Sequence, residues 1–104
     1  MGLPIVSTKL AKFAKKLISD KKYRDSSNMF ICESAKVIKN IMSQGYKLVN
    51  LLITSDSKYL NDFKSLPNVG LISNQTLKSI SLLKNSDGTI AIFEKKVNKI
   101  QIKT

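Results

Sequence analysis

The stretch at residues 28–42 changes its hydrophobic period once, and this change limits the folds that the chain can adopt. Residues 29–32 form a short apolar run with aromatic and β-branched side chains, which predicts a buried strand. Over residues 35–42 the apolar side chains recur every three or four positions, which predicts an amphipathic helix. A strand that leads directly into a helix, followed by a second apolar run at residues 48–53, predicts a βαβ unit.

Two polar residues mark the start of this helix. Ser34 is placed to cap it, because a serine hydroxyl accepts hydrogen bonds from the N–H groups of the first turn. Glu33 is the one acid in an apolar context. We expect its carboxylate to bind backbone N–H groups at the helix start, where it also suits the helix dipole. Gly45 is a plausible residue to end the helix.

The rest of the chain shows the same alternation of short helices and strands. We expect a three-layer α/β/α sandwich around a four-stranded, mostly parallel sheet, formed by residues 1–96 as one domain. Residues 97–104 alternate weakly and predict either an edge strand or a linker. The other predicted elements are a helix capped by Ser7 or Thr8, a charged loop at 20–25, a short helix capped by Ser55 or Asp56, a strand at 69–72, a helix capped by Asn74 with Leu77, Ile80 and Leu83 on one face, a turn at 85–88 and a strand at 89–93.

The charge balance favours a polyanionic partner. The chain carries 18 basic and 7 acidic residues, a net charge of +11, and this excess is typical of nucleic-acid-binding proteins. Seventeen of the 18 are lysines, so an AT-rich coding sequence can supply part of the charge. The basic residues also cluster, since seven of them lie between residues 9 and 24. Six of these are the candidate RNA contacts: Lys9, Lys12, Lys16, Lys21, Lys22 and Arg24. The alternative for this cluster is a solvated helix face.

Tyr23 stands between two of the candidate basic residues, Lys22 and Arg24. Its ring can stack on a base or serve packing, and the sequence leaves both open.

The sequence argues against several other classes of function. It contains no histidine and one cysteine, Cys32, which excludes a Ser-His-Asp or Cys-His arrangement and makes a transition-metal site or an internal disulfide unexpected. The four glycines are scattered and form no phosphate-binding loop. No apolar run approaches the roughly 18–20 residues that span a bilayer. We therefore expect a cytoplasmic chain that is not an enzyme by itself and needs no cofactor.

Three places in the sequence resemble a known module. Arg24 precedes Phe30 at the spacing of an Arg-rich loop, and residues 30–33 match a Phe-x-x-Glu motif whose next residue is usually Gly and here is Ser34. Residues 87–91, with Gly88, resemble a closing Gly-x-x-Ala strand. From about residue 6 to 94, the chain resembles the N-terminal substrate-binding domain of the SpoU/TrmH family of RNA 2′-O-ribose methyltransferases. An Asn-Pro pair that is usual in the family is Leu10-Ala11 here.

The resemblance implies a fold like that of the ribosomal proteins that bind kink-turn RNA. It also implies an RNA partner, ribosomal RNA foremost, and a C-terminal catalytic domain that binds S-adenosylmethionine and follows residue 104. It leaves open whether the parent protein is a homodimer. Two alternatives remain at this point: a free-standing kink-turn-binding or ribosomal protein without catalysis, and a protein-interaction domain whose charge is compositional.

Overall fold

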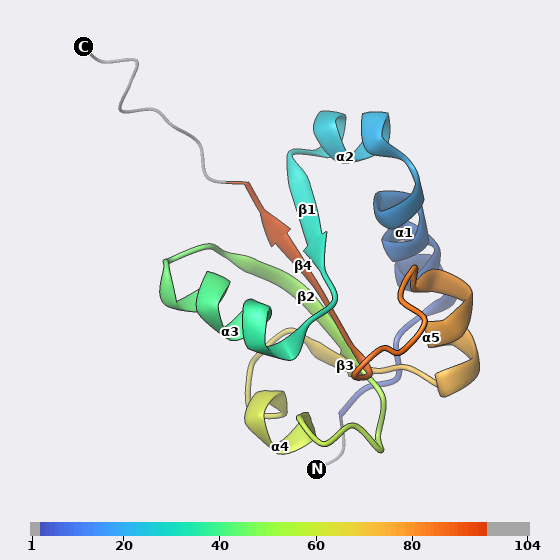
Figure 1. Ribbon diagram of the computed structural model, residues 1–104, viewed down its shortest axis with the longest axis vertical. Helices are drawn as coiled ribbons and strands as arrows, with labels where there is room; N and C mark the ends of the chain where they lie inside the picture. Colours follow the sequence, from blue (N-terminus) through green and yellow to red (C-terminus); the bar gives the residue numbers. More distant parts are fainter. Residues whose placement is uncertain (1–2, 96–104) are drawn as a thin grey trace.

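The computed structural model describes residues 3–95, which form a small α/β domain (Figure 1). Nine helices and strands follow one another in these residues, and all except α2 lie near the positions that the hydrophobic pattern predicts. They are α1 Thr8–Ser19, α2 Lys21–Ser27, β1 Met29–Cys32, α3 Ala35–Ser43, β2 Leu48–Ile53, α4 Leu60–Phe63, β3 Val69–Leu71, α5 Asn74–Ile80 and β4 Thr89–Glu94.

The four strands form a mixed sheet in the order β1-β4-β2-β3. Strand β4 runs antiparallel to both of its neighbours, and only β2 and β3 pair in parallel. The prediction of a mostly parallel sheet is therefore wrong. The reason is that the last strand inserts between β1 and β2, a long-range pairing that the hydrophobic pattern of each strand does not encode.

The β1-α3-β2 segment is consequently a split βαβ unit. Both of its strands pair with β4, so they are parallel to each other without being neighbours. Ser34 caps α3 as predicted, since its hydroxyl accepts a hydrogen bond from the backbone N–H of Val37 at 3.4 Å.

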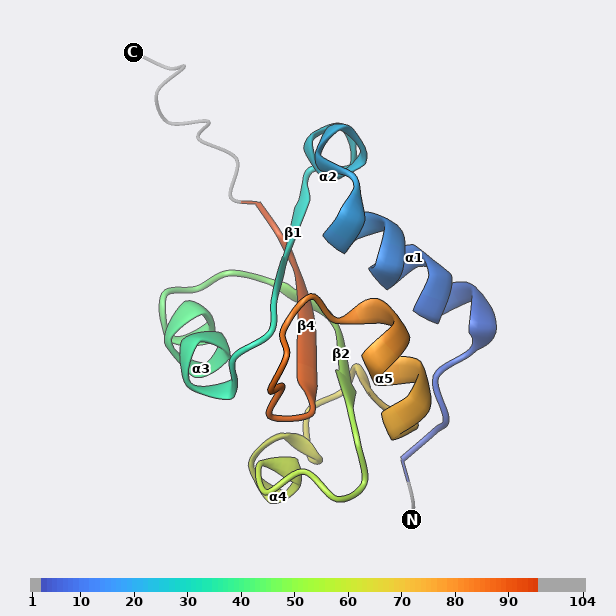
Figure 2. The same ribbon diagram turned by 45° about the vertical axis from the view of Figure 1, so that its right-hand side comes forward.

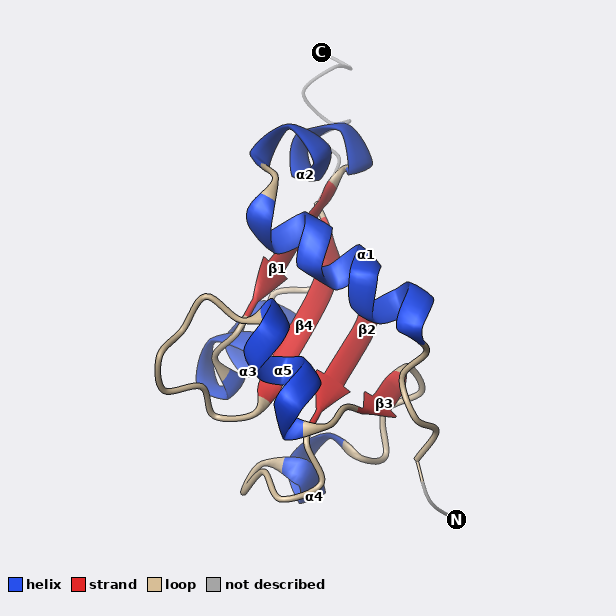
Figure 3. Cartoon of the chain, turned by 90° about the vertical axis from the view of Figure 1, so that its right-hand side faces the viewer, coloured by secondary structure: helices blue, strands red, loops and turns tan. Residues whose placement is uncertain are grey.

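Helices lie on both faces of the sheet, and each face has its own apolar core (Figures 2 and 3). On one face, α1 and α5 pack through Leu17 and Leu77 against Leu52 and Ile90. On the other face, α3 and α4 pack through Ile38 and Phe63 against side chains of β2 and β4. The two cores use alternate residues of the same strands because successive side chains of a strand point to opposite faces.

The segment predicted as a charged loop is the helix α2. Asp20 begins it by accepting a hydrogen bond from the N–H of Tyr23 at 3.1 Å, and Asn28 ends it in the left-handed conformation, with φ +58°. The helix has no residue that is fully buried. Its hydrophobic pattern is therefore too weak to distinguish it from a loop, and the two capping residues are the signal that the sequence does carry.

Smaller differences concern α4 and α5. Ser73, and not Asn74, caps α5 by accepting a hydrogen bond from the N–H of Thr76. The helix ends at Ile80, so Leu83 lies in the following loop. Neither Ser55 nor Asp56 caps α4, which has Tyr59 at its N-cap and no side-chain hydrogen bond there.

The chain before α1 covers the outer edge of β3. The N–H of Val6 donates to the carbonyl of Leu71, and the N–H of Leu71 donates to that of Pro4, each at 2.8 Å. The predicted edge strand or linker at residues 97–104 lies outside the described residues. Within the described part of the chain, no helix is long and apolar enough to cross a membrane.

Gly88 gives a test of this packing. Its φ is +85°, and a Cβ added there would lie 2.6 Å from the hydroxyl oxygen of Thr54, a buried residue at the end of β2. We expect Gly88→Ala to destabilise the domain by about 2–4 kcal/mol, because backbone strain and steric overlap add. Urea unfolding followed by circular dichroism measures this change.

The matched control is Gly45→Ala. Gly45 has nearly the same φ, +87°, but is exposed. Gly45→Ala should lower the free energy of unfolding only through backbone strain, by about 1 kcal/mol. Equal losses in the two variants would show that the space beside Thr54 does not matter.

Candidate nucleic-acid interface

The six predicted RNA contacts lie on α1 and α2, which contact each other at one end of the domain (Figure 3). Lys9, Lys12 and Lys16 follow one another at helical spacing on the exposed side of α1, opposite the buried Leu17. Lys21 and Lys22 are exposed at the start of α2. We call these five lysines the basic surface.

The lysines of the basic surface differ in how free they are. Lys21 pairs with Asp25 at 3.1 Å, and the ammonium of Lys16 lies 4.8 Å from the centre of the Tyr23 ring. No hydrogen bond or ion pair within residues 3–95 engages the side chains of Lys9, Lys12 and Lys22. These three ammonium groups are the ones available to a phosphate.

The carboxylate of Asp25 is held by the basic residues around it. A hydrogen bond from Lys21 and a second one from Lys95 keep its pKa below the ordinary value. The carboxylate therefore stays ionised and neutralises part of the charge at this end of α2.

Tyr23 is a packing residue. Its ring lies edge-on to that of Phe13, with centroids 6.0 Å apart, and one face is covered by Lys16. A base could therefore stack on that face of the ring only by displacing Lys16.

Arg24 has a structural role that its sequence position did not reveal. Its guanidinium donates to the carbonyls of Leu17 and Ile18, each at 2.8 Å, and so satisfies the last turn of α1. A cation at this end also suits the helix dipole. Arg24 thus fixes the angle between α1 and α2, and is less free to bind a phosphate than Lys22.

Arg24 also lines a cavity of about 540 Å³ beside β1, one of the two edge strands of the sheet. The lining is mostly apolar, and it brings together four residues that the sequence singled out. They are Arg24, Phe30, Glu33 and Ser34. Leu82 and Leu83 border this edge cavity and are 74% and 48% exposed.

Phe30 lines the edge cavity and also packs in the core. Its ring stacks on that of Phe93, with centroids 5.4 Å apart, and meets the Tyr46 ring edge-on. One side of Phe30 therefore supports the sheet, while the residue also lines the edge cavity.

The carboxylate that binds the start of α3 is not the one that the sequence predicts. Glu33 accepts a hydrogen bond from the hydroxyl of Ser81 and one from the N–H of Leu82, so it holds the loop after α5 and not the first turn of α3. The N–H of Ala35 instead donates to Asp87 at 2.8 Å. The interpretation of Glu33 as a helix-start acceptor is wrong because a distant residue takes that place.

Gly88, from the closing Gly-x-x-Ala strand of the resemblance, lies at the end of the loop between α5 and β4. It does not line the edge cavity but follows Asp87, whose side chain accepts from the N–H groups of Ala35 and Thr89. No group of three or more histidine, cysteine or acidic residues in the described part of the chain could hold a metal ion.

The domain is similar in fold to parts of several solved methyltransferase structures. The domain is similar to the AdoMet-bound rRNA methyltransferase from Sinorhizobium meliloti, at 18% identity and a TM-score of 0.70 over 90% of this chain and 36% of that chain. It is also similar to the SpoU methyltransferase AviRb from Streptomyces viridochromogenes, at 13% identity and a TM-score of 0.71 over 92% of this chain and 38% of that chain.

A structure described as an RNA 2′-O ribose methyltransferase matches as well, at 23% identity and a TM-score of 0.72 over 92% of this chain and 38% of that chain. The chain thus spans little more than a third of the length of these proteins. No curated protein matches it.

Residues 10–91 match the family model of the MRM3-like substrate binding domain. The chain belongs to this family, the substrate-binding domains of SpoU/TrmH RNA methyltransferases. The resemblance inferred from Arg24, the Phe-x-x-Glu motif and the closing strand is confirmed.

The capping role of Arg24 can be separated from its charge. We expect Arg24→Lys to destabilise the domain by about 1–3 kcal/mol, because Nη1 of the guanidinium donates to both carbonyls of α1 and the lysine side chain ends one bond short of that position. Lys22→Ala, two residues away and exposed, should change the free energy of unfolding by less than about 0.5 kcal/mol. Thermal and urea unfolding of both variants measure the difference, and an Arg24→Lys domain as stable as the wild type would refute the cap.

Cys32, which also lines the edge cavity, should react slowly. Burial raises the pKa of its thiol, an effect that a hydrogen bond with the backbone of Ser34 only partly opposes. The pH–rate profile of alkylation by iodoacetamide should therefore have its midpoint at higher pH in the folded chain than in the urea-unfolded chain.

The same shift predicts a pH effect on stability. Because the folded chain keeps the thiol proton longer, stability should fall as the pH rises from the pKa of the unfolded thiol through that of the folded one. Cys32→Ala should remove this decline, and coincident alkylation midpoints would contradict the assigned effect of burial.

Proposed function

We propose that this domain binds the RNA substrate of an S-adenosylmethionine-dependent RNA 2′-O-ribose methyltransferase, with ribosomal RNA as the substrate. Membership in the MRM3-like substrate binding family is the observation that carries the proposal. The net charge of +11 and the cluster of basic residues at the α1–α2 end agree with a polyanionic partner.

In this proposal the basic surface holds phosphates. Lys9, Lys12 and Lys22 are exposed and make no ion pair with the described residues, so they can replace the counterions of an RNA backbone without first breaking a contact. Lys21 joins them by exchanging its exposed pair with Asp25, which costs little because exposed ion pairs contribute about 0–1 kcal/mol.

In this proposal the edge cavity provides an apolar surface for a base, which the lysines of the basic surface do not provide. Its apolar lining and the exposed Leu82 and Leu83 suit the flat face of an unpaired base, while Arg24 and Glu33 offer a donor and an acceptor at its margin. Phosphate contacts would then position the RNA, and this cavity would favour an unpaired nucleotide over a duplex.

The catalytic part of the activity belongs to the rest of the proposed parent protein. We propose that a C-terminal domain beyond residue 104 binds S-adenosylmethionine, that residues 97–104 connect the two domains, and that the protein works in the cytoplasm. The support is the length of the similar methyltransferases, of which this chain spans 36–38% in the three described above. A reading frame that continues into a methyltransferase domain in the gene would support this arrangement, and a stop codon after Thr104 would contradict it.

Charge reversal on the basic surface tests RNA binding. We expect the triple variant Lys9→Glu, Lys12→Glu and Lys22→Glu to bind a labelled ribosomal RNA fragment at least about tenfold more weakly than the wild type. If about four phosphates are neutralised, the wild-type affinity should fall with the logarithm of the salt concentration at a slope of about −3, and the triple variant should show a smaller slope. Fluorescence anisotropy at several salt concentrations measures both quantities.

The matched control places the same charge change elsewhere. Lys36, Lys47 and Lys64 are also exposed, and they lie outside α1 and α2. Reversal of these three lysines should weaken binding much less. Equal losses in the two triple variants would mean that only net charge matters, and a complex insensitive to salt would refute the phosphate contacts altogether.

A further inference from the structure

A second cavity lies where the two parallel strands end. The chain leaves β2 toward α4 on one face of the sheet and leaves β3 toward α5 on the opposite face. Neighbouring parallel strands whose connections diverge in this way open a crevice outside their carboxyl ends, and ligands of open α/β sheets bind in such crevices. We call this space, of about 530 Å³, the strand-end cavity.

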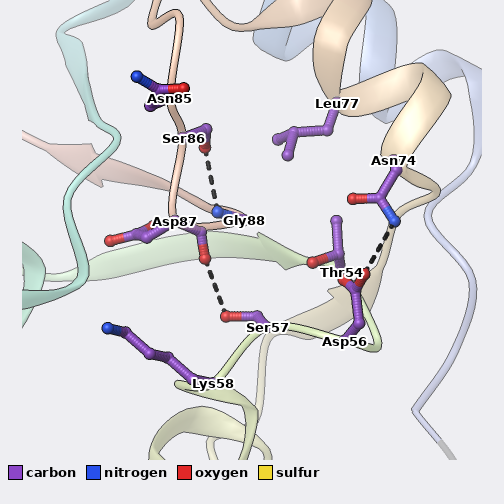
Figure 4. A pocket seen from close by; sticks show the side chains of 10 residues that line it. All are labelled: Thr54, Asp56, Ser57, Lys58, Asn74, Leu77, Asn85, Ser86, Asp87 and Gly88. Atoms are coloured by element: carbon purple, nitrogen blue, oxygen red, sulfur yellow. Dashed lines mark hydrogen bonds between the residues drawn. The ribbon is translucent and has the colours of Figure 1, made fainter.

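Figure 4 shows how three separate segments line the strand-end cavity. The loop after β2 contributes Asp56, Ser57 and Lys58, α5 contributes Asn74, and the loop before β4 contributes residues 85–88. The cavity has no lining residue in common with the edge cavity, and apart from Leu77 and the backbone of Gly88 its lining side chains are polar.

The charge of this lining is unlike that of the rest of the chain. It has two carboxylates, Asp56 and Asp87, and one ammonium, that of Lys58. Both oxygens of Asp87 already accept backbone N–H groups, so Asp87 has a structural role. An anion placed beside Asp56 would be repelled, and a phosphate therefore does not fit the interior of the cavity.

Asp56 is prepared to accept hydrogen bonds from hydroxyl groups. Hydrogen bonds from Thr54 and from the amide of Asn74, the latter at 3.2 Å, lower its pKa. The exposed carboxylate thus stays ionised, and it has lone pairs beyond the two that these donors use. Carboxylates bind the hydroxyl groups of ribose in this manner at the ends of other α/β sheets.

The remaining polar groups suit the same ligand. The Ser86 hydroxyl accepts from the N–H of Gly88 and keeps its own proton to donate. Asn85 is exposed, with both a donor and an acceptor. Lys58 lines the cavity and is exposed, so its ammonium can meet a phosphate next to the sugar.

We propose that the strand-end cavity binds the ribose of an unpaired ribonucleotide in the RNA, with the Asp56 carboxylate accepting a hydrogen bond from the 2′-hydroxyl. This inference rests on the proposed RNA-binding function and adds to it a means of distinguishing RNA from DNA. Phosphate contacts from the basic surface are the same for both nucleic acids, whereas a 2′-hydroxyl is present only in RNA.

The test compares a single-stranded RNA with the DNA of the same sequence, using the full chain and anisotropy at constant salt. The wild type should prefer the RNA by about tenfold, as one hydrogen bond to a charged acceptor provides. Asp56→Ala should lower the affinity for RNA toward that for DNA and leave the affinity for DNA unchanged or slightly higher. Asn85→Ala, which removes an exposed side chain, should reduce the preference in part without affecting folding.

Asp62→Ala is the matched control. Asp62 lies on α4 and pairs with Lys39 of α3, so the substitution removes one exposed carboxylate and changes the net charge by the same amount. It should keep the full preference for RNA. An unchanged preference in both Asp56→Ala and Asn85→Ala, or no preference in the wild type, would overturn the ribose site while RNA binding itself stands. If micromolar free nucleotide abolished the preference for RNA over DNA, the cavity would be assigned to a small ligand and the RNA assignment would be overturned. Absence of RNA binding by the wild type would overturn the proposed function as well.

Discussion

The side chain of Asp87 connects the parts of the domain on which both cavities depend. Its carboxylate accepts from the N–H of Ala35, the first residue of α3, and from the N–H of Thr89, the first residue of β4, while its carbonyl accepts from the hydroxyl of Ser57. Three segments that are far apart in the sequence therefore meet at one residue. Because Glu33 anchors the preceding part of the same loop through Ser81 and Leu82, the whole connection from α5 to β4 is held at two points without belonging to a helix or strand.

This anchored connection separates two environments of different chemistry. On one side, Leu82 and Leu83 border the mostly apolar edge cavity beside β1. On the other, residues 85–88 line the polar strand-end cavity. A ligand with both a flat apolar face and hydroxyl groups, such as an unpaired nucleotide, finds suitable partners on both sides. The hydrogen bonds of Glu33 and Asp87 hold this connection in place between the two surfaces, as a site that distinguishes ligands requires.

The sequence predicts most of the local structure, with α2 and the caps of α4 and α5 as exceptions, and it predicts the long-range structure poorly. The strand at residues 29–32, the helix after it and the cap at Ser34 depend on neighbours in the chain, and they were predicted correctly. The direction of the sheet depends on where β4 inserts, and the true partner of the Ala35 N–H is 52 residues away. Similarly, nothing in the spacing of Arg24 reveals that it binds the carbonyls of α1. The candidate contacts could be named from charge, but which of them are free could not.

Net charge alone therefore overstates how many groups are available to an RNA. Of the six candidate contacts, Arg24 satisfies two carbonyls, Lys21 pairs with Asp25 and Lys16 covers the Tyr23 ring. These interactions shape the α1–α2 end that carries the others. The basic residues thus have two roles. Some fix the angle between α1 and α2, and others stay exposed, without a partner in the described part of the chain, on the surface of these two helices. A change of sign at the first kind would alter binding through folding, whereas a change at the second would act on the complex directly. A surface that binds RNA is therefore defined by the basic residues whose charge reversal weakens the complex without changing the fold, and not by the total charge.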